Sequence, residues 1–454
     1  MRNPASHLPP ALRPQLRALA TCLPLFAFTA WSTSARAEST APTAAPTADA
    51  YPHAVSKKGL QVELLDDALA LGIKHAAINV NLSQLVAPSA KEGNAAYLTW
   101  THDGRTYGFH RGYLEALDGM IKPLSSRGVL VNLIILVYQS DQPDVDRIML
   151  HPKYDRAAPN RLSAFNAQTP EGREWLSATM EFLAERWSRP DQQFGRVVGY
   201  IIGNEVNSHW SWSNMGRVPM QEFAANYIAA LRIAHRAVRQ HSASARIYVS
   251  LEHHWTIRIA GSDELQAFPG KDFIDYLAKR SNEDREGNFD WHIAYHPYPE
   301  NLFEPRFWND KTALPSPQSP RITFKNLEVL TDYLRRPELL YNGKPRRVIL
   351  SEQGFHTPDG PQGEAIQAAA YCYAYRKVAE MEGIDAFILH RHVDHPFEGG
   401  LRLGLRRNTP GAPDPQPKKL IYECFLHADQ PDWEQSFSFA LPIIGIKDWA
   451  DIKR

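Results

Sequence analysis

The chain has 454 residues, and its 50 lysines and arginines are matched by 50 aspartates and glutamates. This balance excludes the excess of one charge that indicates a nucleic-acid or anionic-membrane partner. Beyond the N-terminal region, no stretch reaches the roughly 18 apolar residues of a membrane-spanning helix. Length and composition predict a large folded core and give no indication of a nucleic-acid or membrane partner.

The N-terminus predicts two segments that precede the folded domain. Residues 1–37 begin with basic residues, continue with an apolar run and end at the small-x-small pattern Ala35-Arg36-Ala37. This order is typical of a secretory signal peptide. Residues 38–53 are rich in Ala, Pro and Thr and predict a flexible linker. We expect an exported protein, periplasmic or secreted, whose domain spans 54–454.

Beyond residue 54, strand patterns alternate with helix patterns. Apolar runs of strand length are expected to form strands at 72–80, 129–137, 197–203, 247–251, 289–295, 347–350 and 384–389. Helical patterns fall at 64–71, 112–127, 170–187, 223–238, 273–280, 324–335, 363–381 and 418–428. A polar hairpin is expected at 97–109, with its turn at Asp103-Gly104, and an irregular loop is expected up to 168.

One helix has an unusually clear start. Thr169 is a good N-cap, and Pro170 suits the first helical turn. The apolar residues that follow lie on one face of a helix: Leu176, Met180, Leu183 and Trp187.

Alternating strands and helices imply parallel strands, because each helix must return the chain to the same end of the sheet. An eighth strand near 59–63 would complete a ring. The predicted fold is α/β, a single (β/α)8 TIM barrel with extended βα loops. Glu205 then ends the fourth strand and Glu352 the seventh, on the face where such barrels carry their active sites.

The positions of these two glutamates suit glycoside hydrolysis. Cleavage with retention of configuration needs two carboxyl groups ~5–5.5 Å apart, one as nucleophile and the other as acid and then base. Strands four and seven lie across the barrel mouth, so glutamates at their ends can face each other over a bound sugar.

The blocks Gly203-Asn204-Glu205 and Ser351-Glu352-Gln353-Gly354 resemble those of clan A of the retaining glycoside hydrolases. The longer stretches Gly203 to Gly216 and Ser351 to Phe355 are also similar to a narrower group of bacterial proteins within that clan. The resemblance implies that Glu205 is the acid/base, that Asn204 binds the sugar 2-hydroxyl, and that Glu352 is the nucleophile. It covers the architecture from about residue 59 to 429, but only these short blocks in sequence.

The chain departs from the clan pattern at two strand ends. Where members carry an arginine after strand two, this chain has Asn79 and Asn81, and where many carry a tryptophan after strand eight, it has His390-Arg391-His392. The clan often has a tyrosine on strand six that touches the nucleophile. Here we expect Tyr295 or His296 to make that contact.

Aromatic and polar side chains around the two glutamates are expected to bind sugar, because the apolar face of a pyranose stacks on a ring while its hydroxyls form hydrogen bonds. The candidates besides Asn204 are Asn207, Trp210, Trp212, His254, Trp255, Tyr295, His296, Tyr298, His390 and Arg391. The basic residues Arg391, His392 and Arg402 are a weak indication of an anionic sugar.

Two other functions remain open. A metal-dependent barrel hydrolase could gather His253, His254, His296 and Asp394 round an ion, but the expected His-x-His pair of strand one is missing. A non-catalytic carbohydrate-binding barrel would be expected to lose a carboxylate, and this chain keeps both. We expect a glycosidase that needs no metal or cofactor. Export permits a disulfide between Cys372 and Cys424, although two buried thiols fit equally well.

Overall fold

The computed structural model describes residues 50–91 and 93–452. The predicted signal peptide and residues 38–49 of the predicted linker lie outside the described residues. Tyr51, at the linker's end, packs against the barrel. Its ring lies 3.5 Å from the Arg246 guanidinium carbon, and its hydroxyl lies 3.3 Å from that of Tyr248. The folded domain therefore begins before residue 54.

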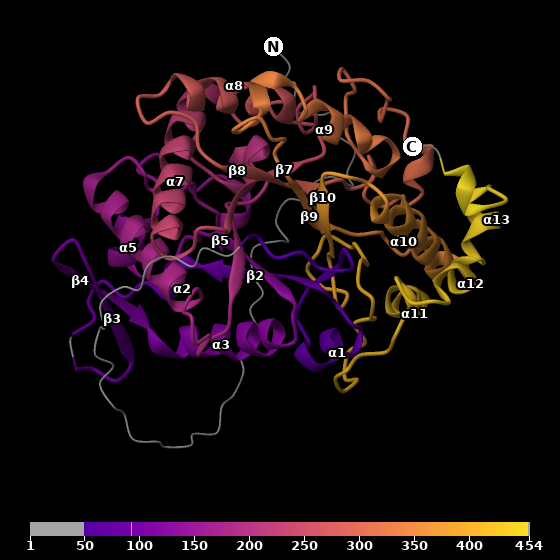
Figure 1. Ribbon diagram of the computed structural model, residues 1–454, viewed down its shortest axis with the longest axis horizontal. Coiled ribbons are helices and arrows are strands. Elements are labelled where there is room, and N and C mark those ends of the chain that lie inside the picture. Colours follow the sequence, from indigo (N-terminus) through magenta and orange to yellow (C-terminus); the bar gives the residue numbers. More distant parts are fainter. Residues whose placement is uncertain (1–49, 92, 453–454) are drawn as a thin grey trace, which may run out of the picture.

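Eight parallel strands close into a barrel, as predicted (Figure 1). In chain order they are β1 (Lys58–Gln61), β2 (His75–Asn81), β5 (Leu130–Leu136), β6 (Val197–Ile202), β7 (Arg246–Glu252), β8 (Trp291–His296), β9 (Val348–Gln353) and β10 (Ile384–Leu389). The additional strand expected near residues 59–63 is β1, the first barrel strand in chain order. It closes the ring by pairing with β10, and Gly59 lies opposite Ile388.

Helices surround the barrel (Figure 1). The longer or predicted ones are α1 (Leu65–Ala70), α3 (Arg111–Ser126), α5 (Pro170–Arg186), α7 (Met220–His241), α8 (Gly270–Glu283), α9 (Glu328–Tyr333), α10 (Gly363–Ala379) and α11 (Leu420–His427). The helix expected over 324–335 is split into a 3-10 turn, Phe324–Asn326, and α9.

Several short helices were not predicted. They are α2 (Leu82–Leu85), α4 (Pro143–Met149), α6 (His209–Trp212), α12 (Trp433–Phe437) and α13 (Ala440–Ile444). Helices of one or two turns are too short to show a periodic apolar face. Because α4 lies between β5 and α5, the expectation of an irregular loop up to residue 168 was wrong in part. Figure 1 shows α11, α12 and α13 together beside α10.

Two local predictions are confirmed. The Thr169 hydroxyl accepts the backbone N–H of Gly172 at 3.0 Å, and α5 begins at Pro170. The hairpin consists of β3 (Tyr97–His102) and β4 (Arg105–His110). Asp103 and Gly104 both have positive φ, 47° and 75°, as a type I′ turn requires.

The barrel interior is filled with side chains that alternate with those facing the helices. Ile134, Ile201, Ala294, Ile349 and Ile388 belong to the inner cluster and are almost completely buried. Since this interior is packed, chemistry is confined to the ends of the strands.

Among the described residues, no helix is both long and apolar enough to span a bilayer. Cys372 of α10 and Cys424 of α11 are buried free thiols, so the structure has two separate thiols and not the disulfide that export would permit. Burial raises the pKa of the Cys372 thiol, and the neighbouring Cys424 raises it further.

Candidate active site

Glu205 and Glu352 meet at the carboxyl ends of the barrel strands. Glu205 follows β6, the fourth strand of the ring, and Glu352 lies near the end of β9, the seventh. One oxygen of each carboxylate and one ring nitrogen of His296 lie within 4.8 Å of one another. The two glutamates therefore face each other from opposite sides of the mouth.

The backbone directs the Glu205 side chain to this position. Glu205 has a left-handed conformation with φ of 40°, which is uncommon for a residue other than glycine and recurs at functional sites. Its N–H donates to the Ser250 hydroxyl at 3.0 Å, and its carbonyl accepts the N–H of Ser208 at 2.8 Å. Contacts on both sides of the peptide hold the conformation in place.

His296, at the end of β8, lies between the two strand ends. Its Nδ1 is 2.9 Å from Oε1 of Glu205, and its Nε2 is 3.0 Å from the Ser351 hydroxyl. Burial raises the pKa of Glu205, the partly positive His296 opposes this shift, and the charge of Glu352 adds to it. Glu205 therefore keeps its proton to a higher pH than an ordinary glutamic acid.

Glu352 has the opposite tendency. Its Oε1 accepts the Tyr298 hydroxyl at 3.3 Å, and its Oε2 accepts the Gln61 amide, also at 3.3 Å. Removal from water would raise the pKa of Glu352, but the positive charges of His390 and His296 and the hydrogen bond from Gln61 hold it below its ordinary value. One carboxyl is thus favoured as an acid and its neighbour as an anion.

The expected contact from strand six to Glu352 is made by Tyr298, so the expectation of Tyr295 or His296 was wrong for this contact. The Tyr295 side chain is buried on the outer side of the barrel, where its hydroxyl donates to the Ile322 carbonyl. Tyr295 is therefore not placed to bind sugar. His296 contacts Glu205 instead of Glu352.

Two predicted sugar ligands instead hold a third glutamate, Glu252, at the end of β7. Asn207 donates its amide to Glu252 Oε1 at 2.5 Å, and His254 Nδ1 lies 2.5 Å from Oε2. Both side chains are buried. Burial would raise the pKa of Glu252, but the charge of His254 and its hydrogen bond outweigh this and lower it to about 2. Asn207 and His254 thus support the loop that follows strand five.

The predicted tryptophans separate into two kinds. Trp255 is completely buried, its Nε1 donates to the Pro317 carbonyl at 3.0 Å, and its ring packs against Tyr333. The prediction that Trp255 stacks on sugar is therefore not supported. Trp210 and Trp212 are half-buried after Glu205, and Trp212 packs on the inner barrel cluster at the mouth.

The strand ends that depart from the clan pattern are occupied by polar contacts. Asn81 caps α2 through its side chain, and Asn79 is exposed. His390 lies between Gln61 and Glu398, with distances of 2.7 Å and 2.5 Å. Sequence reasoning did not single out Gln61, although it lies within the strand expected near 59–63. Glu398 lies in a long loop and carried no signal.

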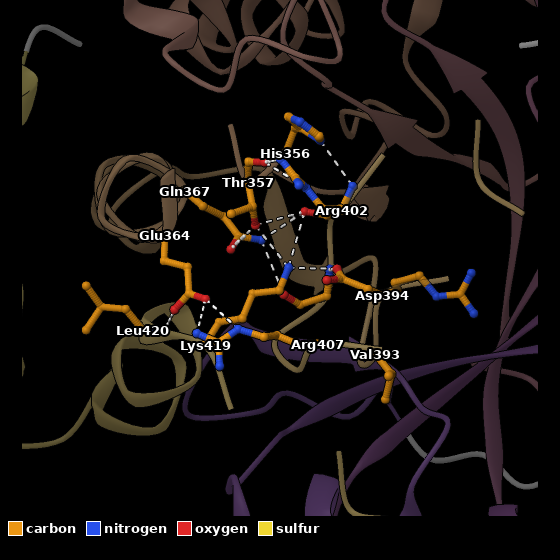
Figure 2. Close-up of polar contacts among 12 residues, drawn as sticks. His356, Thr357, Glu364, Gln367, Val393, Asp394, Arg402, Arg407, Lys419 and Leu420 are labelled. Atoms are coloured by element: carbon orange, nitrogen blue, oxygen red, sulfur yellow. Dashed lines mark hydrogen bonds and ion pairs between the residues drawn. The ribbon is translucent and has the colours of Figure 1, made fainter. Parts of the chain in front are cut away.

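The basic residues near strand eight are paired with carboxylates, which weakens the indication of an anionic sugar. Arg391 donates to Glu63 at 2.9 Å, and the fully buried His392 lies 2.7 Å from Asp67. Arg402 donates to the Thr357 carbonyl (Figure 2). It also contacts Asp359.

Two groups of described side chains have ligand atoms close enough for a metal ion: Glu252, His253 and His254, and Glu205, His296 and Glu352. In the first group Glu252 is already saturated by hydrogen bonds. Asp394 joins neither group. It is bound by Lys419 at 2.7 Å (Figure 2) and also accepts the Gly404 N–H. The predicted metal set of His253, His254, His296 and Asp394 is not brought together.

The solved structures that are similar to this chain include several glycoside hydrolases. A family 39 glycoside hydrolase from Bacteroides cellulosilyticus WH2 matches 83% of this chain with a TM-score of 0.52 and 13% identity. A β-glucosidase from Pyrococcus furiosus matches 84% with a TM-score of 0.48 and 15% identity, and it is covered over 86% of its own length. An exo-β-1,4-mannosidase from Opitutaceae bacterium strain TAV5 matches 82%, with a TM-score of 0.45 and 15% identity, and is covered over 55%.

This chain spans 63% of the family 39 protein, and at such low identity the likeness concerns the fold. The expected resemblance to clan A is thus confirmed as a shared barrel. By sequence, residues 50–452 match a family of unknown function, DUF5722, and the chain belongs to that family. No curated protein sequence matches it.

Proposed function

We propose that this protein is a retaining glycoside hydrolase that cleaves a glycosidic bond in a poly- or oligosaccharide. The observation that carries the proposal is the pair formed by Glu205 and Glu352. Their oxygens lie within 4.8 Å of each other and of His296, and their pKa values are displaced in opposite directions. This separation suits the short carboxyl spacing of retaining sites rather than the ~6.5–9.5 Å of inverting ones.

In the first step, the Glu352 carboxylate attacks the anomeric carbon while the protonated Glu205 donates its proton to the departing glycosidic oxygen. A glycosyl ester on Glu352 results, and the leaving group departs as an alcohol. In the second step, Glu205, now an anion, takes a proton from water, and the hydroxide oxygen displaces Glu352 from the same carbon. Two inversions give net retention, and both carboxyl groups return to their starting states.

The described residues around the pair supply plausible sugar contacts. Asn204 precedes the acid/base directly, and Tyr298 lies against Glu352. Trp210 and Trp212 are half-buried and lie in the segment that follows Glu205. These four side chains support a bound pyranose that spans the two carboxyl groups.

We also propose that the protein acts outside the cytoplasm, after removal of residues 1–37. This proposal rests on the basic, apolar and small-x-small order of the N-terminus. Sequencing the N-terminus of protein recovered from the periplasm or the medium tests it. A mature chain that begins at Glu38 is expected, and a retained Met1 would contradict export by this route.

The deciding experiment screens purified residues 38–454 against a panel of polysaccharides and 4-nitrophenyl glycosides, with sizing of the products. Proton NMR of the first-formed sugar is expected to show the anomer of the substrate. The Glu352→Gln variant serves as the matched inactive control. An inverted anomer would disprove the double displacement. Binding without any product would favour the non-catalytic carbohydrate-binding barrel.

The same assay distinguishes the metal-dependent alternative. Incubation with EDTA is expected to leave the rate unchanged, because the proposed chemistry uses two carboxyl groups alone. Loss of activity that zinc or calcium restores would instead favour an ion held by Glu205, His296 and Glu352.

A further inference from the structure

Gln61 has an amide whose orientation is fixed by its neighbours. The residue ends β1, and its Nε2 lies 3.2 Å from the Ser351 carbonyl oxygen and 3.3 Å from Oε2 of Glu352. A carbonyl oxygen and a carboxylate oxygen can only accept hydrogen bonds, so the group that faces them is the –NH2. The other end of the amide, Oε1, therefore faces His390 as an acceptor.

This orientation fixes the protonation of His390. Nδ1 lies 2.7 Å from Oε1 of Gln61, so Nδ1 must carry a hydrogen. Nε2 lies 2.5 Å from Oε1 of Glu398, which is an acceptor when ionised. The Arg391 guanidinium, 3.7 Å from the same oxygen, favours the ionised form of Glu398. With a hydrogen on both nitrogens, His390 is an imidazolium.

Glu398 is built to hold that charge. Its side chain is 2% exposed, although it lies in the loop after β10, and a buried carboxylate is costly unless it has a cationic partner. The His390 side chain is 12% exposed, and Gln61 forms a hydrogen bond with it on one side and with Glu352 on the other. Within this buried ion pair, the positively charged His390 is therefore the partner on the side of Glu352.

Other charged and titratable groups surround this arrangement. Arg391 and His395 lie on the same loop as Glu398, and Glu63 follows β1. His296 ends β8, Tyr298 follows it, and Tyr138 follows β5. Arg391 is drawn toward Glu63 and Glu398, and Tyr138 and Tyr298 are neutral hydroxyls. His296 is the other potential cation near Glu352, but its hydrogen bond goes to Glu205.

We propose that Glu398, His390 and Gln61 form a relay that keeps Glu352 ionised and aimed for attack. The three are positioning residues, since Gln61 touches the proposed nucleophile and the other two act through it. In other clan members an arginine after strand two supports the nucleophile. Here the relay would supply the positive charge instead, through Gln61 of the first strand and His390 after the eighth. It rests on the proposed glycosidase function.

A first test needs no substrate. Protein labelled with ¹⁵N-histidine is followed by NMR of the ring nitrogens, with the His390 signals identified by their loss in His390→Gln. In the wild type, both nitrogens are expected to remain protonated at pH 8, above the ordinary histidine pKa of about 6.5. In Glu398→Gln, this signature should be lost below pH 7. A neutral His390 in the wild type at pH 7 would overturn the relay.

A second test uses whichever 4-nitrophenyl glycoside the screen identifies. In Glu398→Gln and in Gln61→Leu, the acid limb of the kcat/KM profile should move up by about one pH unit, which is roughly a tenfold loss at low pH. The double variant should lose no more than the larger single loss, because both changes break one chain of contacts. Additive losses, or an unmoved acid limb, would contradict the relay.

The matched control is Glu364→Gln, which removes an ion pair with Arg407 at the first turn of α10 (Figure 2). Its acid limb and its histidine spectrum should equal those of the wild type. The two proposals can fail separately. A wild type that hydrolyses no glycoside would disprove the proposed function, whereas the His390 titration decides the charge of the relay by itself.

Discussion

Nδ1 of His296 lies 2.9 Å from Oε1 of Glu205, so the proposed acid/base shares a proton with a buried imidazole. The same ring reaches the hydroxyl of Ser351, the residue before the proposed nucleophile. The charge of His296 acts on both carboxyl groups, so their titrations belong to the group as a whole.

The pH profile of kcat/KM should be bell-shaped. As the pH falls through the lowered pKa of Glu352, the nucleophile is protonated and the rate is lost. As the pH rises through the raised pKa of Glu205, the acid loses its proton. Because the two shifts move apart, the plateau between the limbs should be wide.

Variants at Glu205 and His296 assign the basic limb. On an activated substrate, Glu205→Ala should abolish it, and His296→Asn should move it to higher pH, since the imidazole opposes the rise in the Glu205 pKa. If the basic limb stays in Glu205→Ala, a different group sets it, and His296 becomes the first candidate.

Replacement of Glu352 and replacement of Glu205 should lower activity by different amounts. Glu352→Gln cannot form the glycosyl ester and should lower kcat/KM by ~10⁴-fold or more. Glu205→Ala should cost only ~10²-fold on a 4-nitrophenyl glycoside, because a good leaving group needs little protonation. Azide should then restore turnover and yield a glycosyl azide of retained configuration, detectable by mass spectrometry and NMR. Equal and unrescued losses would argue against these roles.

Replacement of the tryptophans should separate packing from sugar binding. Trp255→Ala opens a cavity in the core and should destabilise the fold by about 3–5 kcal/mol, measured by denaturant unfolding. Trp212→Ala should cost less stability than Trp255→Ala, because Trp212 is only half-buried, and it should raise KM roughly tenfold, because it removes a ring from the barrel mouth. A stable Trp255→Ala with a raised KM would restore the original expectation of a sugar contact.

Lys419 and Asp394 form a buried ion pair within the segment between β10 and α11, and Lys419 also donates to the Thr357 hydroxyl in the loop after β9 (Figure 2). Lys419→Met leaves Asp394 without its cation and should cost about 3–5 kcal/mol of unfolding free energy. Lys418→Met is the matched control, since its pair with Glu423 is half exposed and should contribute less than about 1 kcal/mol. Adding Asp394→Asn to Lys419→Met should recover part of the loss; no recovery would mean that Lys419 acts mainly through its packing.

Much of the barrel could be predicted because each buried strand is a dense apolar run and most intervening helices have a periodic face. Val197–Ile202 and Ile384–Leu389 are examples whose ends fell where expected. Glu205 and Glu352 followed from their positions at strand ends. Tyr298 was predicted as a sugar ligand, but its contact with Glu352 depends on the path of the chain after β8, which periodicity does not describe.

The side chains that support the site were harder to predict. Glu398 reaches His390 from a loop without regular structure, and Asn207 and His254 turn toward Glu252 instead of toward the mouth. Trp255 resembled a sugar platform in sequence because burial of an aromatic ring depends on distant segments such as the one that carries Tyr333. These contacts join residues far apart in the chain, so no local pattern marks them.

The pairing of β1 with β10 has a consequence for how the molecule matures. Gln61 and His390, which touch across this seam, are 329 positions apart in the chain. Lys58 of β1 also reaches the carbonyl groups of Phe425 and Ala428 at the end of α11. Joining such distant segments carries a large loop-closure cost, so this seam is suited to form late in folding. A chain lacking its last hundred residues would keep Glu205 and Glu352, but it would lack β10 and could not close the barrel around them.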